Sequence, residues 1–447
     1  MIESQTTEFK PNWRDEYLKS ISAFANTDGG KLLIGFDDQG NPIGVKNSKK
    51  LLEDIPNKII SKLGITPSVE LIKKQNKEVI CISIQPTPTM ISYHGKHYIR
   101  CGSTTQEING SELSQLILNK AGKSWDSLFS EVGLEEINEE TVNYFKKLAN
   151  DKVASISKSD SKKKIFTNLE LINNNNLRNA ALLLFGKNPQ SYFFSSKARV
   201  GRFKTGIDIV DTVIAEGNLF EQLETVLEAI KKHLNVKFEI KDIQRKDVWD
   251  YPLEAIREAV INSLIHKDYL STAEIQIKIY DDKIWIWNPG KLASELKVDD
   301  LKKDHSSYPR NPLIANVFYL SGYIERWGSG TKRIVDLCKE QGLPEPEYKE
   351  EQGGFSVWFF KDIYSEEILQ KMGLNERQIK AVLYVKEKGK IANKEYRTMF
   401  NISDRTALTD LNDLIDKNLL EKTGTTGRGI AYNLTRNKPE KPETNPK

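Results

Sequence analysis

The sequence lacks the features that mark several large classes of protein. It has no GxxxxGK[ST] motif, which excludes a nucleotide site of the P-loop type. It has no run of about 18 apolar residues, so we expect no membrane-spanning segment. The N-terminal stretch MIESQTTEFK contains no apolar signal segment. The three cysteines show no CxxC spacing, which disfavours a disulfide framework or a zinc site and favours a cytoplasmic protein.

The composition is that of a large globular chain. Hydrophobic residues make up 38% of the 447 positions, which is enough apolar material for about three or four domains. The net charge of +4 is small, but it is unevenly distributed. Residues 375–447 hold 15 Lys and Arg against 10 Asp and Glu, whereas the remainder is close to neutral. This local surplus fits either a nucleic-acid-binding module or a solvated basic tail.

Changes in residue pattern divide the chain into regions. A Ser- and Lys-rich stretch near 152–164 is typical of a linker. A hairpin pattern at 275–287 is followed by a late strand pattern at 355–360. We therefore expect an α+β multidomain protein with these regions: an α/β domain at 1–118, a helical or α+β connecting region at 119–240, an α/β sandwich at 241–362, a helix-rich module at 374–435 and a disordered tail at 436–447.

A group of residues between 257 and 334 has the chemistry of a nucleotide site. Glu258 and Asn262 are four residues apart, so they share one face of the helix expected to begin near residue 251. The Glu258 carboxylate can polarise a water molecule, and the Asn262 amide oxygen can bind Mg²⁺. Further along, Asn288 and Gly290 form a turn whose backbone can approach a flat base closely.

A glycine-rich turn completes this group. Gly328 and Gly330 precede a helix that starts near Thr331, where free backbone N–H groups favour a phosphate. Each piece alone is weak, because a Glu–Asn pair is usually a solvated face and a Gly-Ser-Gly turn is usually only a turn. Their order and spacing together predict that ATP, if the protein uses it, binds here.

The stretch 257–360 resembles the ATP-binding domain of GHKL type found in RecG-like and divergent transcriptional regulators. The resemblance rests on the segments 258–269 (EAVINSLIHKDY), 288–290 (NPG), 309–312 (PRNP) and 323–330 (YIERWGSG). It implies Glu258 as catalytic base, Asn262 as Mg²⁺ ligand, and Gly328 and Gly330 as phosphate contacts. That superfamily usually has Asp at the position of Asn288, so the acceptor for the adenine amino group is uncharged here and hydrolysis stays open. Arg310 fits either a phosphate contact or a structural arginine.

Carboxylates near the N-terminus follow a pattern used by metal-dependent nucleases. Glu8 and Lys10 are two residues apart and share a face if the chain is extended. In such a pair the carboxylate binds the cation and the amine steadies the charged oxygen. Glu3 joins them only if the chain bends in between. Asp37 and Asp38 end the next strand, so three or four carboxylates are expected around one or two Mg²⁺ or Mn²⁺ ions.

Residues 1–110 resemble the Schlafen-type AlbA domain. The resemblance rests on residues 3–4 and 8–10 and on the segments 23–30 (AFANTDGG), 34–38 (IGFDD), 44 and 98–104 (YIRCGST). Some members of that family cleave structured RNA, which implies Glu3, Glu8 and one of Asp37 or Asp38, with Asp37 favoured, as a catalytic and metal-binding set. Catalytic members pair two such lobes, so one lobe needs a second copy. Other relatives only bind nucleic acid, for which Arg100 and Ser103 offer phosphate contacts.

Residues 375–434 have the outline of a winged helix and are similar to the helix-turn-helix ends of bacterial regulators. Three helix patterns precede a hairpin around a glycine-rich turn. Such a module lays its third helix in the major groove and its wing along the backbone. This assigns nucleic-acid contacts to Arg405, Thr406, Thr409 and Arg428. Asp404, Asp410 and Asp413 on the same helix weaken a DNA interpretation, so a protein-binding use stays open.

Three functions follow from these patterns. The first is a nucleotide-responsive, nucleic-acid-binding regulator in which ATP biases a conformational equilibrium and the winged helix selects the DNA. The second is an enzyme, a metal-dependent nuclease gated by the nucleotide and acting in cell defence. The third is a degenerate ATPase scaffold that binds only proteins. Self-association is expected of a regulator, although no motif proves it.

Overall fold

The computed structural model describes residues 2–149, 157, 159–204, 207–241, 244–293, 295–325, 328–362, 364, 366–424 and 430–435. The chain forms two compact units. Unit 1 comprises Met1–Pro189, Asp268–Thr272 and Pro309–Leu320, and unit 2 comprises Gln190–Lys267, Ala273–Tyr308 and Ser321–Lys447. Within the described ranges, no helix has the length and apolarity needed to cross a membrane. The expected tail at 436–447 and Arg428 lie outside the described residues.

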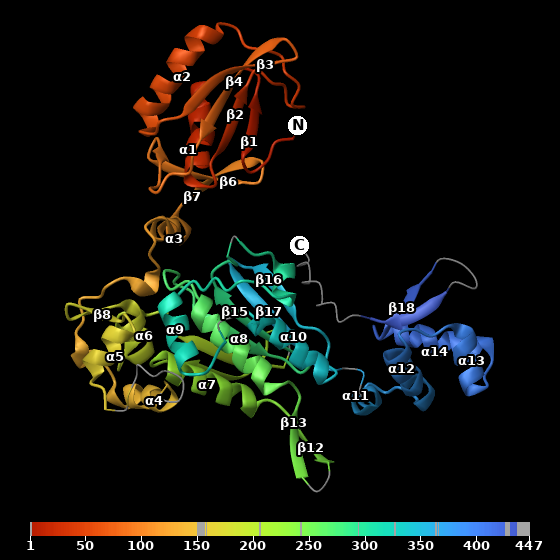
Figure 1. Cartoon of the computed structure of the whole chain (residues 1–447). Helices are drawn as coiled ribbons and strands as arrows, with labels where there is room; N and C mark the ends of the chain where they lie inside the picture. The colour runs from red at the N-terminus through yellow and green to blue at the C-terminus, as the bar shows by residue number, and fades with distance from the viewer. Residues whose placement is uncertain are drawn as a thin grey trace. The chain divides into compact units, whose positions relative to one another are not determined.

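Unit 1 begins with a four-stranded sheet of order β1-β2-β4-β3 (Figure 1). Its strands are β1 (Thr7–Lys10), β2 (Gly30–Ile34), β3 (Ser68–Lys74) and β4 (Lys77–Ile84). β1 pairs with β2 in parallel, and the other pairs are antiparallel. Helices α1 (Leu18–Asn26) and α2 (Ser48–Leu63) bury their apolar stripes with alternate strand residues in one core, which includes Phe24, Leu32 and Ile82.

A second, three-stranded sheet of order β5-β6-β7 follows. Its strands are β5 (Ser92–Tyr93), β6 (Lys96–Cys101) and β7 (Thr104–Ile108), and helix α3 (Gly110–Lys120) comes next. β6 packs beside α1, where Asn26 holds it by donating its side-chain amide to the carbonyls of Ile91 and Tyr98 at 2.8 and 2.9 Å. The buried Asn26 side chain therefore connects α1 with β6 and with the segment just before β5.

The remainder of unit 1 is mainly helical. Its elements are α4 (Glu139–Ala149), α5 (Lys162–Asn168), the short hairpin β8 (Ile172–Asn173) and β9 (Asn176–Leu177), α6 (Asn179–Phe185) and α9 (Pro312–Leu320). The expected linker near 152–164 thus overlaps the first turn of α5. Asp126 accepts hydrogen bonds from the backbone N–H groups of Leu313 and Ile314 at 2.8 and 3.1 Å, so it caps the N-terminus of α9. This cap explains why residues 309–320 belong to unit 1.

Unit 2 is built on a six-stranded sheet of order β11-β10-β14-β15-β17-β16. Its strands are β10 (Ala198–Phe203), β11 (Ile209–Ala215), β14 (Ile275–Ile279), β15 (Lys283–Pro289), β16 (Glu347–Glu351) and β17 (Gly354–Phe360). β10 and β14 are parallel, and every other neighbouring pair is antiparallel. The expected boundary at residue 241 falls inside this unit, because the sheet already includes β10 and β11.

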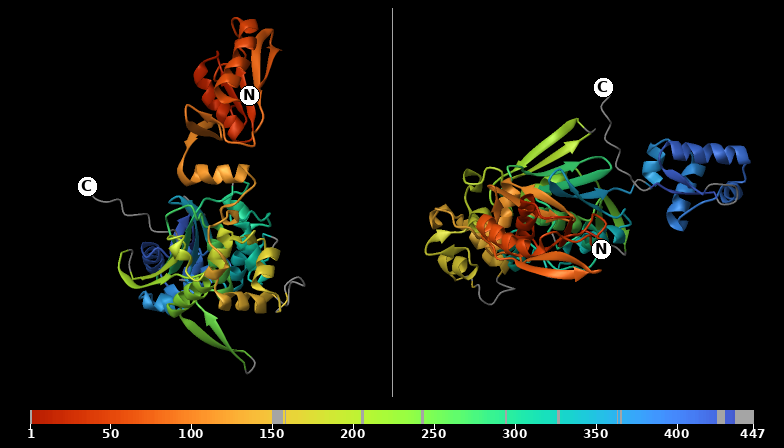
Figure 2. Two further views of the ribbon diagram at one scale, coloured as in Figure 1. Left: turned by 90° about the vertical axis from the view of Figure 1, so that its left-hand side faces the viewer. Right: turned by 90° about the horizontal axis from the view of Figure 1, so that it is seen from above.

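Three helices accompany this sheet, namely α7 (Leu219–Lys232), α8 (Leu253–His266) and α10 (Gly330–Glu340). α8 contacts α7, α10 and β15, so it occupies the middle of the helical layer (Figure 1). The antiparallel hairpin β12 (Val236–Lys241) and β13 (Gln244–Trp249) extends away from these helices (Figures 1 and 2). Because α8 contacts α10, the polar residues Glu254 and Glu258 of α8 lie beside α10.

The C-terminal module follows α11 (Glu366–Lys371) and has its own core. It contains α12 (Glu376–Lys388), α13 (Asn393–Phe400), α14 (Asp404–Asp416) and the hairpin β18 (Leu420–Thr423) and β19 (Ala431–Leu434). A bridge between Ile391 and Tyr432 ties the hairpin to the segment before α13. The order of helices and strands is the one expected from the sequence, and the residues between the strands, 425–429, lie outside the described ranges.

Candidate nucleotide and nucleic-acid sites

The first candidate cluster forms because the chain bends sharply before β1. Ser4 and Thr7 exchange backbone hydrogen bonds of 2.9 and 3.4 Å across a tight turn. Glu3 therefore returns to β1, where it accepts from the Phe9 backbone N–H at 2.9 Å. The Lys10 ammonium lies 2.9 Å from Glu8 and 3.8 Å from Glu3. The structure thus brings Glu3, Glu8 and Lys10 together.

Other partners already occupy the Glu8 carboxylate. Its Oε1 accepts from the Ser20 hydroxyl at 3.1 Å in addition to the Lys10 contact, and its Oε2 accepts from Arg100 at 2.6 Å. Arg100 is 3% exposed and also donates to the Ser4 carbonyl and the Thr105 hydroxyl. The buried Glu8 carboxylate has a cation on each oxygen and links β1 to β6. Neither oxygen is free to bind a metal ion.

The expected cation site of Glu3, Glu8 and Asp37 is not formed. Asp37 accepts from the backbone N–H groups of Gln39 and Asn41 and from the Asn41 side chain, which makes it the first residue of a turn. The Asn41 backbone N–H is the main cause that lowers the pKa of Asp37. Asp38 is exposed. Over the described residues, no group of three or more His, Cys, Asp or Glu side chains is placed to hold a metal.

The two expected phosphate contacts of this domain differ in accessibility. Arg100 is buried by its contacts with Glu8, Ser4 and the Phe24 ring, which lies 4.8 Å from its guanidinium. Its assignment to nucleic-acid binding is therefore wrong, because no donor of this group reaches the surface. Ser103 lies in the exposed turn between β6 and β7 and stays available for such a contact.

The second candidate cluster lies on α8. Asn262 donates its side-chain N–H to Glu258 Oε1 at 3.3 Å, as their spacing on one helix predicts. Burial raises the pKa of the Glu258 carboxyl, and the Asn262 hydrogen bond opposes that shift. A carboxylate whose pKa is raised toward neutrality suits a general base. Because Asn262 donates through Nδ2, its carbonyl oxygen is left for a cation.

Gly330 brings the N-terminus of α10 against this pair. A Cβ atom at this position would lie 2.1 Å from Glu258 Oε1, so a larger residue would require the end of the Glu258 side chain to move. Gly328 is more strongly constrained, because its φ is +69° and a Cβ would lie 2.1 Å from the His305 carbonyl oxygen. Both glycines that the sequence predicts as phosphate contacts therefore serve close backbone approaches at the start of α10.

Residues that the sequence did not suggest complete this region. His305 contacts the Thr331 hydroxyl through Nε2 at 3.0 Å, and the Thr331 carbonyl accepts from Tyr348 at 2.8 Å. Arg333 forms ion pairs with Glu254 at 2.8 Å and Glu325 at 3.5 Å. Of these residues, the sequence had indicated only Thr331, because the partners in these contacts lie 8 to 79 positions apart.

Of the residues expected to form a base-binding turn, Asn288 lies near the end of β15 and only Gly290 follows the strand. Asn288 is buried, 6% exposed, and pairs with Phe355 in the sheet register. Its side-chain N–H points to the Pro289 carbonyl at 3.3 Å, which leaves its side-chain oxygen as an acceptor. Gly290 is buried with φ of +117°, a conformation that favours glycine. These residues fit an adenine amino group, although the acceptor carries no charge.

Arg310 belongs to unit 1, whereas the α8 and α10 residues belong to unit 2. Burial lowers the pKa of its guanidinium, and the negative charge of Asp268, also in unit 1, opposes that shift. A buried guanidinium near a carboxylate fits a structural arginine, which is one of the two alternatives that the sequence left open for Arg310.

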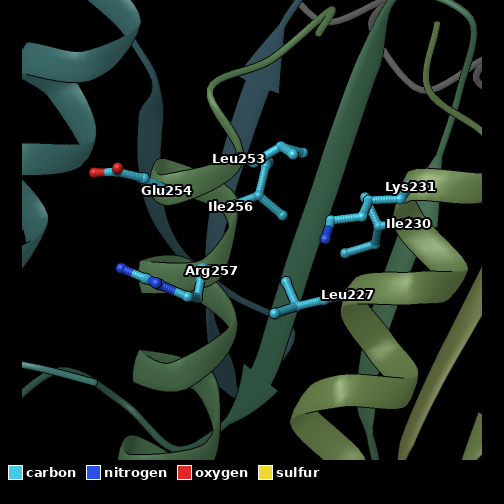
Figure 3. A pocket seen from close by; sticks show the side chains of 7 residues that line it. All are labelled: Leu227, Ile230, Lys231, Leu253, Glu254, Ile256 and Arg257. Carbon is cyan, nitrogen blue, oxygen red and sulfur yellow. The ribbon is translucent and has the colours of Figure 1, made fainter. Parts of the chain in front are cut away.

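A pocket of about 140 Å³ lies between α7 and α8 (Figure 3). Its lining residues are Leu227, Ile230, Lys231, Leu253, Glu254, Ile256 and Arg257. The polar ends of Glu254 and Arg257 point away from the α7 side chains (Figure 3). Glu254 lines this pocket and also forms an ion pair with Arg333 of α10, whereas Glu258, which lies beside Gly330, is not among the lining residues.

In the C-terminal module, α14 separates inward and outward polar residues. Asp410 is buried and accepts from Arg377 at 3.0 Å and from Tyr396 at 2.9 Å. Asp413 accepts from Gln378 and Lys417, and the Lys417 hydrogen bond is the main cause that lowers its pKa. Arg405 and Thr409 are exposed, and Thr406 is half-buried beside the capping residue Ser403. Asp404 lies 3.4 Å from Arg397, so all three acids that weakened a DNA interpretation have a cationic partner within the module.

Two family models match the chain. Residues 3–109 match the model described as "Schlafen, AlbA_2", and residues 272–359 match the model described as "Putative ATP-dependent DNA helicase recG C-terminal". The chain thus carries a Schlafen AlbA_2 domain and a RecG-like, ATPase-like domain, which relates it to nucleic-acid-binding, ATP-related proteins. The second match includes Asn288, Gly328 and Gly330 but not α8. No curated protein matches the sequence.

Two solved structures are similar to the chain. The DIP2311 protein from Corynebacterium diphtheriae is 17% identical, with a TM-score of 0.47, and the alignment covers 96% of this chain and 92% of that one. The other is the N-terminal domain of a "Putative ATP-dependent DNA Helicase RecG-related Protein" from Nitrosomonas europaea. It is 25% identical with a TM-score of 0.20, and the alignment covers 24% of this chain and 86% of that one.

Proposed function

We propose that this chain is a nucleotide-responsive, nucleic-acid-binding regulator of transcription. The observation that carries the proposal is the convergence of Glu258, Asn262 and Gly330 where α8 meets the N-terminus of α10. Asn262 would hold Mg²⁺ there, and an ATP molecule bound through that ion would contact both helices. A ligand shifts a conformational equilibrium only through contacts that differ between the two states, and the closely packed start of α10 supplies such contacts.

The surface of α14 supports the nucleic-acid part of this proposal. Arg405 is exposed, and none of the ion pairs of the described residues involves it. Asp410 and Asp413 are turned to partners within the module, so their charges do not oppose a phosphate backbone. The winged helix therefore selects the DNA, and the AlbA_2 domain adds a second nucleic-acid surface through residues such as Ser103.

The first test is binding of ATP with Mg²⁺ to the full chain by titration calorimetry. We expect saturable binding that Asn262→Ala removes, because the amide oxygen is the proposed cation ligand. Glu258→Gln keeps the shape of the side chain and is expected to retain binding while abolishing any hydrolysis. If the unaltered chain binds no ATP with Mg²⁺, the nucleotide part of the proposal is wrong.

The second test measures coupling between nucleotide and nucleic acid. The affinity for labelled double-stranded DNA is followed by fluorescence anisotropy over a range of salt concentrations, with and without ATP. We expect ATP to change the affinity by about fivefold or more, a coupling of about 1 kcal/mol. Arg405→Ala should weaken binding and reduce its salt dependence, whereas Lys417→Ala, already paired with Asp413, should not. An ATP-independent affinity contradicts the regulator.

A nuclease is the second candidate, and the partly exposed Glu3, whose carboxylate lies 3.8 Å from the Lys10 ammonium, favours it. Glu8→Ala is a poor control here because it breaks a buried ion pair with Arg100. Glu3→Gln is the sharper variant, since this side chain is partly exposed. Total tRNA and DNA are incubated with Mn²⁺ or Mg²⁺. Cleavage that Glu3→Gln abolishes establishes the nuclease, and no cleavage by the unaltered chain rejects it.

A further inference from the structure

β11 is the edge strand of the six-stranded sheet in unit 2. It pairs with β10 on one side, and no described strand or isolated bridge pairs with its other side. An edge strand turns alternate backbone N–H and C=O groups outward, where another strand can pair with them. β11 therefore presents a row of hydrogen-bonding groups along the margin of unit 2.

The exposed side chains of this strand are apolar. Ile209, Val210 and Ile214 are 59%, 64% and 46% exposed, and Ile207 just before the strand is 88% exposed. The strand contains no Lys, Arg or Pro. Its single charge, Asp211, is turned toward α7, where it lies 2.7 Å from Lys232 and 3.0 Å from His233. The bulge in its pairing lies between Arg202 and Phe203, so residues 211–215 keep a regular register.

The opposite edge of the same sheet is built differently. β16 has the sequence EYKEE, in which four of five residues are charged. Charged side chains on an edge are a common protection against pairing with another chain. One edge of the sheet is thus protected and the other is not, which indicates that β11 has a partner.

The pattern of β11 fits a second copy of itself. Exposed Val210, Thr212 and Ile214 alternate with the less exposed Asp211, Val213 and Ala215. An antiparallel pair with its two-fold axis at Thr212 places Val210 opposite Ile214 of the second copy, twice, and Thr212 opposite its own equivalent. Asp211 then faces Val213, so no like charges meet. Each such cross-strand pair contributes roughly 0.2–1 kcal/mol.

We propose that the chain forms a two-fold dimer through β11, which joins the two six-stranded sheets into one continuous sheet. The interface is isologous, because the same strand serves both copies. It is independent of nucleotide and of nucleic acid.

The test is the mass of the full chain in solution by light scattering and sedimentation over a range of concentrations. The unaltered chain is expected to have twice the chain mass. Val210→Lys with Ile214→Lys should weaken the dimer at least about tenfold, because the new charges lie opposite each other. Ile60→Lys on α2, at a residue 47% exposed, is the matched control and should leave the dimer intact. Equal thermal midpoints for all three proteins show that the fold is kept.

A single cysteine makes the geometry testable. Directly opposed residues of an antiparallel pair have Cα atoms about 4.5–5.5 Å apart, which is within disulfide range. In a Cys101→Ser background, which removes the exposed thiol, Thr212→Cys should cross-link to its own equivalent under mild oxidation, and Ile60→Cys should not. A monomeric unaltered chain, or a dimer that tolerates both lysines and fails to cross-link at position 212, overturns the proposal.

Discussion

Glu8 of unit 1 and Glu258 of unit 2 are both carboxylates in candidate sites, but their hydrogen-bond and ion-pair partners differ. Glu8 contacts Arg100, Lys10 and Ser20, so both of its oxygens are engaged by strong donors. Glu258 has one neutral amide donor, Asn262, and burial raises its pKa. The first carboxylate is held by two cations and a hydroxyl, whereas the second has a neutral amide as its hydrogen-bond donor.

This difference separates a structural role from a chemical one. A buried ion pair with no unused oxygen holds two strands together, and its removal leaves an uncompensated charge. A partly buried carboxyl with a raised pKa, next to an amide and a glycine, is suited to proton transfer. Three experiments test this distinction, and they follow in order of expected effect.

Arg100→Ala should have the largest effect. Removing the guanidinium leaves Glu8 buried with only Lys10 as a cation, which typically costs about 3–5 kcal/mol. Lys96→Ala on the same strand, β6, is the control, because its ion pair with Glu107 is exposed to solvent and contributes little to stability. Hydrogen exchange across residues 1–110 of the full chain measures both. Equal protection in the two variants would mean that the Glu8–Arg100 pair is not a structural tie.

Gly328→Ala and Gly330→Ala should differ from each other. At Gly328 the new Cβ meets the backbone of His305 and the φ is positive, so we expect a loss of about 1–3 kcal/mol. At Gly330 the Cβ meets the end of the Glu258 side chain, which can rotate away, so the loss should stay below about 1 kcal/mol. Thermal unfolding measures this order, and the reverse order would place Glu258 away from α10.

Glu258→Gln should have the smallest effect on stability and the opposite sign. The folded pKa is raised above the ordinary value of 4.5, so ionisation at higher pH disfavours the folded state. The variant and the unaltered chain should be equally stable below pH 4.5. As the pH rises through the raised pKa, the variant should become more stable, by about 1–2 °C in Tm. A pH-independent difference would assign it to packing alone.

Local patterns of the sequence predicted much of the fold. The hairpin of β14 and β15 and the strand β17 are confirmed, because alternation and turn residues lie within a few positions of each other. The parallel pairing of β10 with β14 joins segments more than 70 residues apart, and no local pattern indicates it. The boundary expected at residue 241 was misplaced for that reason.

The same limit applies to the candidate sites. The spacing of Glu258 and Asn262 on one helix predicted their contact, and the convergence of Glu3 with Glu8 was expected only on condition of a bend, which the turn at residues 4–7 provides. The turn at Asp37 has a local signature in the glycine and asparagine that follow it, which points to a structural aspartate.

The sequence by itself therefore determined the residue types, the spacing along each helix and strand, and the two domain families. The tertiary structure alone decided that Arg100 is buried against Glu8, that Gly330 meets Glu258, and that β11 ends the sheet with its apolar side chains exposed. The physical reason is that the charge state and the accessibility of a side chain depend on partners and burial. Segments far apart in the chain supply both.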